Sequence, residues 1–314
     1  MLGNVETVVK AEGDIFYVIQ QDNTDPSLLI AGTQSAVIHI NKTSGEITTV
    51  SGNRTVSGYQ ETRISKPSSL VSGSLFNRVS GIKQSYLSYI IADRNNHCLR
   101  SINKWTGRTS TQAGNCTRSG WADGKHRAAL FTSPGPMVVD ISDSDMILIA
   151  GMCIRTYDSG TSMVSTLPNS CMRDGKFYTG IFLDMEGEIF VLESSRVLKY
   201  TSSASDTALK VIAGNETKIE VCSNCSFIDA RFESLSDARF VLPTVVLVVE
   251  SGSHRLWLLN MTERVVLSLV SGENGTMNGY YREVKVHRPQ SLTMDESFIY
   301  IGEDGNLRKV AYSG

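Results

Sequence analysis

Six cysteines are the residues of this chain best suited to covalent chemistry, and four of them fall into two pairs with the same spacing. Cys98 and Cys116 are 18 residues apart, and so are Cys153 and Cys171. In each pair the first cysteine opens a repeated six-residue phrase, and the second follows a later strand-like run. This equivalence predicts two disulfides, Cys98–Cys116 and Cys153–Cys171, because neighbouring antiparallel strands bring such positions together.

The other two cysteines, Cys222 and Cys225, form a C-x-x-C motif. Such a motif can be a redox pair or half of a zinc site. No helix-forming pattern follows it, and the sequence has no second C-x-x-C. A small disulfide between Cys222 and Cys225 that closes a loop is therefore the expected pairing.

A zinc enzyme would need about three histidines that converge on one point. Only His126 and His287 lie in loops that precede a repeat unit, and they belong to different units. His97 and His254 hold equivalent positions just before the repeated phrase, and His39 lies inside it, which favours structural roles. No H-E-x-x-H, G-x-S-x-G or P-loop spacing occurs. We expect no catalytic residue, no metal and no cofactor.

Acidic residues recur where an apolar stretch of the repeat ends, at Asp93, Glu193, Glu250 and Glu303. A ring of carboxylates on one face could bind a cation or a basic ligand. The alternative, which we favour, is that each carboxylate caps a strand end and accepts hydrogen bonds from the adjacent loop.

The elements that position these residues come from one six-residue sequence motif that recurs six times, which is typical of repeat architectures. The hexamers lie at 36–41, 98–103, 153–158, 196–201, 255–260 and 306–311. Each follows an apolar stretch, at 27–32, 88–93, 146–151, 188–193, 245–250 and 298–303. Five are followed by a third run, at 47–52, 109–114, 163–168, 209–214 and 267–272. Short β-branched runs separated by turn residues predict strands.

The sixth unit lacks its third run, and the segment 5–10 resembles one that has no unit of its own. We predict that this segment closes the sixth sheet, because a propeller with unjoined ends leaves open strand edges. Innermost strands before the apolar runs, for example at 13–19, 134–140, 178–184 and 289–295, complete four per unit. The prediction is an all-β, single-domain, six-bladed β-propeller over 1–314 with four-stranded antiparallel blades. The split last blade argues against the competing open β-solenoid.

Three segments carry a resemblance to a known family. ADRNNHCLRSI (92–102) resembles the D-x-x-N-H-x-(I/L)-R signature of NHL-repeat propellers. DGKHRAALFTSPGPMVVD (123–140) resembles the loop that precedes a unit in that family, and DARFVLP (237–243) repeats its A-x-F-x-x-P core. The resemblance implies a six-bladed propeller that binds a partner. Some extracellular relatives, the peptidyl-hydroxyglycine lyases, are zinc enzymes, so the alternative is an extracellular metal-dependent lyase or hydrolase.

Composition and sequons bear on the compartment. The net charge of −2 gives no footprint for nucleic acid. No apolar run reaches the roughly 18 residues of a membrane span, and Met1 opens no visible signal peptide, so membrane attachment would need a segment outside this chain. Seven Asn-x-Ser/Thr sequons occur, at Asn41, Asn53, Asn115, Asn215, Asn224, Asn260 and Asn274. With the paired cysteines they favour an extracellular or cell-surface location, although turns in a repeat also favour asparagine.

We therefore expect a secreted or cell-surface ligand-binding or adhesion module that binds a protein partner through loops on one face. The loop after the third unit has no sequon, so glycans on the other sectors would leave it the least shielded. The predicted contacts are aromatic and basic residues of the loops, which are typical hot spots: Trp121, Arg173, Lys176, Phe177 and Tyr178. Each could instead pack against its own blade.

Overall fold

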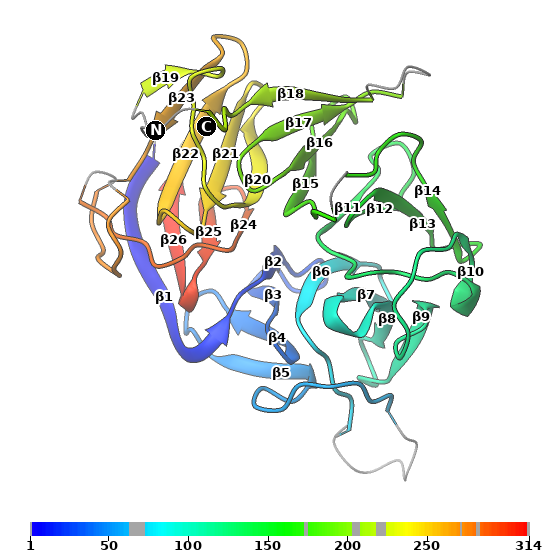
Figure 1. Cartoon of the computed structure of the whole chain (residues 1–314). Helices are drawn as coiled ribbons and strands as arrows, with labels where there is room; N and C mark the ends of the chain where they lie inside the picture. The colour runs from blue at the N-terminus through cyan, green and yellow to red at the C-terminus, as the bar shows by residue number, and fades with distance from the viewer. Residues whose placement is uncertain are drawn as a thin grey trace.

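The computed structural model describes residues 2–62, 73–172, 175–202, 208–217, 224–270, 272–280 and 283–312. Six antiparallel sheets are arranged radially around a central axis, as Figure 1 shows. The chain is thus a six-bladed β-propeller, which confirms the fold predicted from the repeats.

The first three blades follow each other along the chain. Blade 1 is β2 (Val18–Gln21), β3 (Leu28–Gly32), β4 (Ala36–Asn41) and β5 (Ile47–Gly52). Blade 2 is β6 (Val79–Gln84), β7 (Ser88–Asp93), β8 (Cys98–Asn103) and β9 (Thr109–Gly114). Blade 3 is β11 (Met137–Val139), β12 (Met146–Ala150), β13 (Ile154–Asp158) and β14 (Met163–Thr166), with β10 (Gly124–Lys125) added outside β14.

The other three blades continue the same meander. Blade 4 is β15 (Gly180–Leu183), β16 (Ile189–Leu192), β17 (Val197–Tyr200) and β18 (Leu209–Ala213). Blade 5 is β20 (Leu235–Leu242), β21 (Val245–Glu250), β22 (Arg255–Asn260) and β23 (Val265–Ser268), with β19 (Asn224–Ser226) added outside β23. Blade 6 is β24 (Ser291–Met294), β25 (Phe298–Gly302), β26 (Asp304–Tyr312) and β1 (Leu2–Ile15).

Helical structure in the described ranges is limited to two 3-10 turns in loops, η1 (Arg94–Asn96) and η2 (His126–Ala128). Within those ranges no helix is long and apolar enough to cross a membrane.

The ring is closed by the N-terminal strand, as predicted. Val5 pairs with Val310 and Lys10 with Asn306, so β1 is the outermost strand of blade 6. β1 is longer than the predicted segment and extends to Ile15. The innermost strand of blade 1 consequently starts at Val18, five residues later than the start of the run predicted at 13–19.

The hydrophobic core lies between the blades rather than inside one compact centre. Each of six buried clusters joins two neighbouring sheets; one of them packs Phe182 and Phe190 of blade 4 against Trp257 of blade 5. The alternating apolar positions of each strand therefore face the adjacent blade. A closed ring leaves no blade without a partner on either side, which is why the N-terminal closure matters for packing.

Both repeat-equivalent disulfides are present. Cys98 bonds Cys116, and Cys153 bonds Cys171, each across a separation of 18 residues. Each ties the start of the third strand of its blade to the segment after the outermost strand. The third predicted disulfide involves Cys222, which lies outside the described residues, so that pairing stays a prediction.

Candidate functional site

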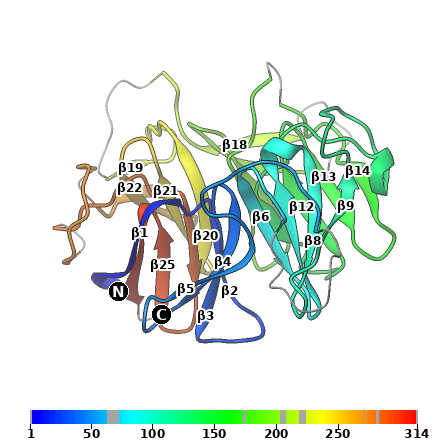
Figure 2. The same ribbon diagram turned by 90° about the horizontal axis from the view of Figure 1, so that it is seen from below.

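The propeller has two unlike faces, which Figure 2 shows at the top and bottom of the molecule. One, here the hairpin face, carries the turns between the first and second strands of each blade and the short turns between the third and fourth strands of blades 1, 2, 3 and 5. The other, here the loop face, carries the longer inter-blade loops that run from an outermost strand to the next innermost strand. Because function tends to lie on loops held by a rigid scaffold, the loop face is the candidate binding surface.

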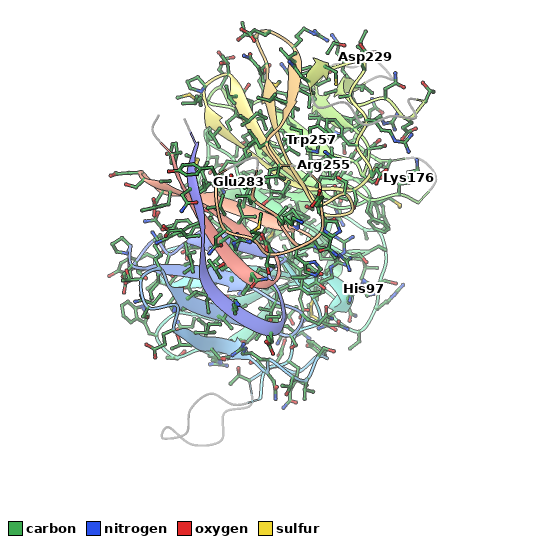
Figure 3. The ribbon with its side chains drawn as sticks, turned by 90° about the vertical axis from the view of Figure 1, so that its left-hand side faces the viewer. His97, Lys176, Asp229, Arg255, Trp257 and Glu283 are labelled. Carbon is green, nitrogen blue, oxygen red and sulfur yellow. A yellow bond between two sulfur atoms is a disulfide. The ribbon has the colours of Figure 1, made fainter. Side chains whose placement is uncertain are left out.

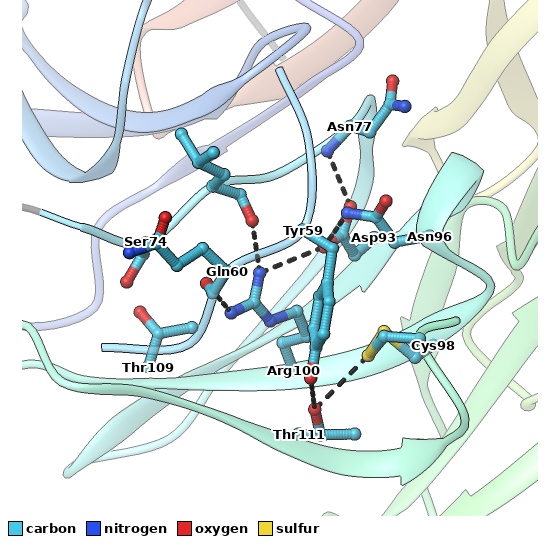
Figure 4. Close-up of polar contacts among 12 residues, drawn as sticks. Tyr59, Gln60, Ser74, Asn77, Asp93, Asn96, Cys98, Arg100, Thr109 and Thr111 are labelled. Carbon is cyan, nitrogen blue, oxygen red and sulfur yellow. Dashed lines mark hydrogen bonds and ion pairs between the residues drawn. A yellow bond between two sulfur atoms is a disulfide. The ribbon is translucent and has the colours of Figure 1, made fainter. Parts of the chain in front are cut away.

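Three inter-blade loops are clamped by a buried arginine at the third position of the hexamer. Arg100 donates to the carbonyls of Leu75 (2.5 Å) and Gln60 (2.6 Å), which pair with each other across the loop (Figure 4). Blades 3 and 6 repeat the contact, with Arg155 bound to the carbonyls of Leu130 and Ala122, and Arg308 to those of Lys285 and Met277. These clamps preorganise the loop face.

Three of the four recurring carboxylates accept a hydrogen bond from the backbone of an inter-blade loop, as the strand-cap interpretation predicts: Asp93 from Asn77, Glu250 from Ser234 and Glu303 from His287. Asp93 accepts hydrogen bonds from the Asn77 backbone (2.8 Å), the Asn96 side chain (2.8 Å) and Arg100 (3.2 Å). The other three also bond within their own blades: Glu193 with Arg196 (2.5 Å), Glu250 with the indole of Trp257 (2.9 Å) and Glu303 with Arg308 (3.5 Å). The carboxylates therefore stabilise individual blades.

Glu303 should make the stability of the protein depend on pH. Its side chain is fully buried, and burial raises the pKa of the carboxyl to about 8 against the opposing effect of Arg308. The folded chain binds this proton more tightly than the unfolded chain, whose carboxyl has a pKa of 4.5. The stabilisation is therefore present below pH 4.5 and is lost as the pH rises to about 8, by at most roughly 1.4 kcal/mol per pH unit.

Glu303→Gln should accordingly flatten the decrease in the free energy of unfolding between pH 5 and 8, measured by urea titration. Glu296→Gln, which removes an exposed carboxylate from the same blade, is the control and should leave the slope unchanged. An equal slope in wild type and Glu303→Gln would contradict the raised pKa.

The equivalent histidines brace neighbouring loops. The Nδ1 atom of His97 accepts a hydrogen bond from the Ser133 backbone (3.2 Å), and that of His254 from the Arg288 backbone (3.0 Å). Both histidines have a left-handed backbone, with φ of 58° and 56°. His254 also stacks on His287, with ring centroids 5.8 Å apart. Among the described residues no group of three His, Cys, Asp or Glu side chains is placed to hold a metal ion.

The predicted partner contacts separate into available and unavailable side chains. Lys176 is exposed and, like His97, belongs to the loop face (Figure 3). Phe177 is half-buried, with its ring 5.6 Å from the Arg94 guanidinium. Trp121 is 39% exposed and lies 5.8 Å from the Arg155 guanidinium. The prediction for Tyr178 needs correction, because this side chain is fully buried and donates to the Ser170 carbonyl (2.8 Å).

Arg173, the remaining predicted contact, lies outside the described residues. The sequon asparagines Asn53, Asn115 and Asn215 follow the outermost strands of blades 1, 2 and 4 on the loop face. Their side-chain oxygens accept hydrogen bonds from the threonine two positions later, so these asparagines also shape turns.

A channel runs along the axis, lined by all six innermost strands, with a volume of about 300 Å³. Asp237, Arg239 and Lys83 lie along it. Asp237 accepts a hydrogen bond from the Leu292 backbone (2.9 Å), and burial raises the pKa of its carboxyl to about 6, with Arg239 opposing. At the loop face the channel meets a smaller cavity of about 130 Å³ that contains Arg78 and Arg94. Sequence reasoning missed this arginine pair.

Sequence reasoning also missed a set of exposed apolar side chains on the hairpin face. Its members sit at turns of blades 2 to 4: Tyr86, Leu87, Trp105, Ile141 and Met185. Trp105 is 70% exposed and lies edge-on to Tyr86, with ring centroids 6.5 Å apart. These side chains make the hairpin face a second candidate binding surface, so a test of binding at the loop face needs a control on the hairpin face.

Comparisons with known proteins bear on the fold of the chain. The sequence matches no family model and no curated protein. Solved structures do match. An auxiliary nutrient binding protein from Bacteroides thetaiotaomicron aligns with a TM-score of 0.74 at 13% identity, over 99% of this chain and 76% of that one.

Two further matches are an enzyme and a component of a protein complex. Virginiamycin B lyase from Staphylococcus aureus aligns with a TM-score of 0.58 at 10% identity, over 98% of this chain and 99% of that one. A chain of the nidogen/laminin complex aligns with a TM-score of 0.56 at 9% identity, over 90% and 85%. At such identities the matches establish the six-bladed propeller and nothing about its ligand. The NHL-repeat resemblance is not confirmed by any of them.

Proposed function

We propose that this chain is a secreted or cell-surface binding module of the NHL-repeat type that binds a protein partner through its loop face. The observation that carries the proposal is the sector where the loop between β14 and β15 meets blade 2. There the accessible ring of Phe177 lies against Arg94, and Lys176 next to it is exposed. Aromatic and arginine side chains dominate the binding energy of protein interfaces.

Rigidity of the surrounding loops supports the same choice. The arginine clamps fix pairs of backbone carbonyls in three other inter-blade loops, so the residues that carry these carbonyls lose little conformational entropy on binding. Glycans on Asn53, Asn115 and Asn215 would cover the sectors after blades 1, 2 and 4 and leave the sector between blades 3 and 4 open. Two disulfides favour an oxidising compartment, and a nutrient binding protein and a chain of a protein complex share the fold.

The test is an affinity measurement on single variants, after a partner has been found by screening extracellular proteins with a multivalent, glycosylated form of the chain. Phe177→Ala should weaken binding by about 1–2 kcal/mol, roughly fivefold to thirtyfold. Trp105→Ala removes a more exposed aromatic side chain from the hairpin face and should leave the affinity unchanged. The reverse pattern would assign binding to the hairpin face and reject the proposal.

A further inference from the structure

The mouth of the channel on the loop face is a built cavity to which every blade contributes. Its volume is about 130 Å³, and every blade contributes at least one lining residue, among them Tyr17, Arg78, Arg94, Pro136, Thr179, Ser234 and Gln290. Among these described residues, hydroxyl, amide and guanidinium groups face the cavity and none is a carboxylate. Most of these hydroxyl and amide groups already bond within the protein, so the two guanidinium groups are the main donors open to a ligand.

Two arginines dominate this lining, and the backbone holds them side by side. Arg78 precedes β6 and Arg94 follows β7, and the Arg94 amide donates to the Arg78 carbonyl (3.0 Å). Arg78 has a left-handed backbone with φ of 64°, a conformation that an arginine adopts only at a cost in free energy. Its guanidinium lies 4.6 Å from the ring centre of Tyr17. Aromatic rings thus flank both guanidinium groups.

The described part of the chain places no carboxylate against the positive charge at the mouth, since none lies at ion-pair distance from Arg78 or Arg94. Burial, and then repulsion from Arg78, lower the pKa of Arg94 to about 10, so it remains a cation at neutral pH. The Nε atom of Arg78 is buried and has no hydrogen-bond partner. Two half-buried cations without a counter-charge are costly unless an anion completes the site.

The nearby acids are already engaged. Asp93, next to Arg94 in sequence, is fully buried and bonded to Arg100, on the side away from the channel. Asp304, which influences Tyr17, pairs with Arg288 (3.4 Å) and accepts from Gln290 (3.4 Å). Among the residues that the structure describes, these two acids are thus committed elsewhere, and an anionic ligand would supply the missing counter-charge.

We propose that the channel mouth is a binding site for a carboxylate group, held by Arg78 and Arg94. Arginine forks match the planar, bidentate geometry of a carboxylate. The flanking rings of Tyr17 and Phe177 provide apolar surface for the carbon that carries it. This inference rests on the proposed function, because the carboxylate site lies at the centre of the loop face that is proposed to bind the partner. The carboxylate belongs either to an acidic side chain or chain end of the protein partner, or to a free small organic acid.

Titration with defined small molecules tests the site directly. Acetate, N-acetylglycine as a mimic of a chain end, and glucuronate as a sugar acid are added at constant ionic strength, with binding followed by calorimetry. At least one should bind saturably, and Arg78→Gln combined with Arg94→Gln should weaken it at least tenfold. Arg118→Gln removes one exposed positive charge from the same face and should change nothing. Preference for N-acetylglycine would indicate a protein source, and preference for glucuronate a free acid.

A second measurement needs no variant. Phenylglyoxal modifies accessible arginines, and the bound carboxylate should protect Arg78 and Arg94 in wild-type protein at least fivefold relative to Arg118. Absence of both saturable binding and protection would overturn the site, as would tighter binding of sulfate than of every carboxylate. The proposed function fails separately, through the response of the protein partner to Phe177→Ala.

Discussion

Deletion of residues 1–10 should lower the melting temperature by about 10 °C or more, because this segment closes the propeller. β1 is the outermost strand of blade 6, and its removal leaves β26 with an unpaired edge. It also removes Val5 from the cluster between blades 5 and 6, and Val9 from the cluster between blades 6 and 1. A fully buried valine alone contributes roughly 1.5 kcal/mol or more.

A point variant separates the loss of packing from the loss of pairing. Val5→Asp places a carboxylate in the blade 5–6 cluster and should reproduce several degrees of the loss, whereas Asn4→Asp adds the same charge at the exposed neighbour and should be neutral. Differential scanning calorimetry measures all three proteins. An unchanged melting temperature after the deletion would mean that blade 6 is stable with three strands.

The repeats predict most of the fold because each strand carries its own local signal. Three of the six hexamers have the same bounds as the strands β4, β8 and β22, and a fourth lies within β26. The other two differ from β13 and β17 by one residue at one or both ends. The run predicted at 267–272 is shifted, since β23 spans Val265–Ser268. The short strands β10 and β19 were not predicted, because they form only where a loop meets the edge of a blade already in place.

The candidate site is less accessible to sequence reasoning because it depends on distant contacts. Phe177 and Tyr178 are adjacent aromatic residues. The Phe177 side chain lies half-buried against Arg94, whereas the Tyr178 side chain is fully buried. No local pattern distinguishes them, since the difference arises from which side of the loop packs on blade 3. Arg78 and Arg94 are 16 positions apart and become a pair through pairing of β6 with β7, whereas the cavity that they line needs all six blades.

Arg100→Met should lower the free energy of unfolding by about 3–5 kcal/mol, the second large effect that the structure predicts. Arg100 and Asp93 are both fully buried and form an ion pair at 3.2 Å. Loss of the guanidinium leaves a buried carboxylate without its counter-charge and leaves the Leu75 and Gln60 carbonyls without their donor. Unfolding in urea, followed by tryptophan fluorescence, measures the loss.

The pH dependence and a double variant identify the cause of that loss. Burial already raises the pKa of Asp93 to about 6 with Arg100 present, so without Arg100 the carboxyl should stay protonated to higher pH. The cost of Arg100→Met should therefore be smaller at pH 5 than at pH 8. At pH 8 the buried carboxyl must either ionise without a counter-charge or keep its proton well above its pKa in the unfolded chain. Adding Asp93→Asn should recover part of the loss at pH 8, but not all, because the two loop carbonyls stay unpaired.

Arg108→Met, at an exposed position in the same blade, should cost less than about 0.5 kcal/mol. If Arg100→Met were equally mild, the clamp would contribute nothing to stability, and the rigidity inferred for the loop face would lose its physical basis.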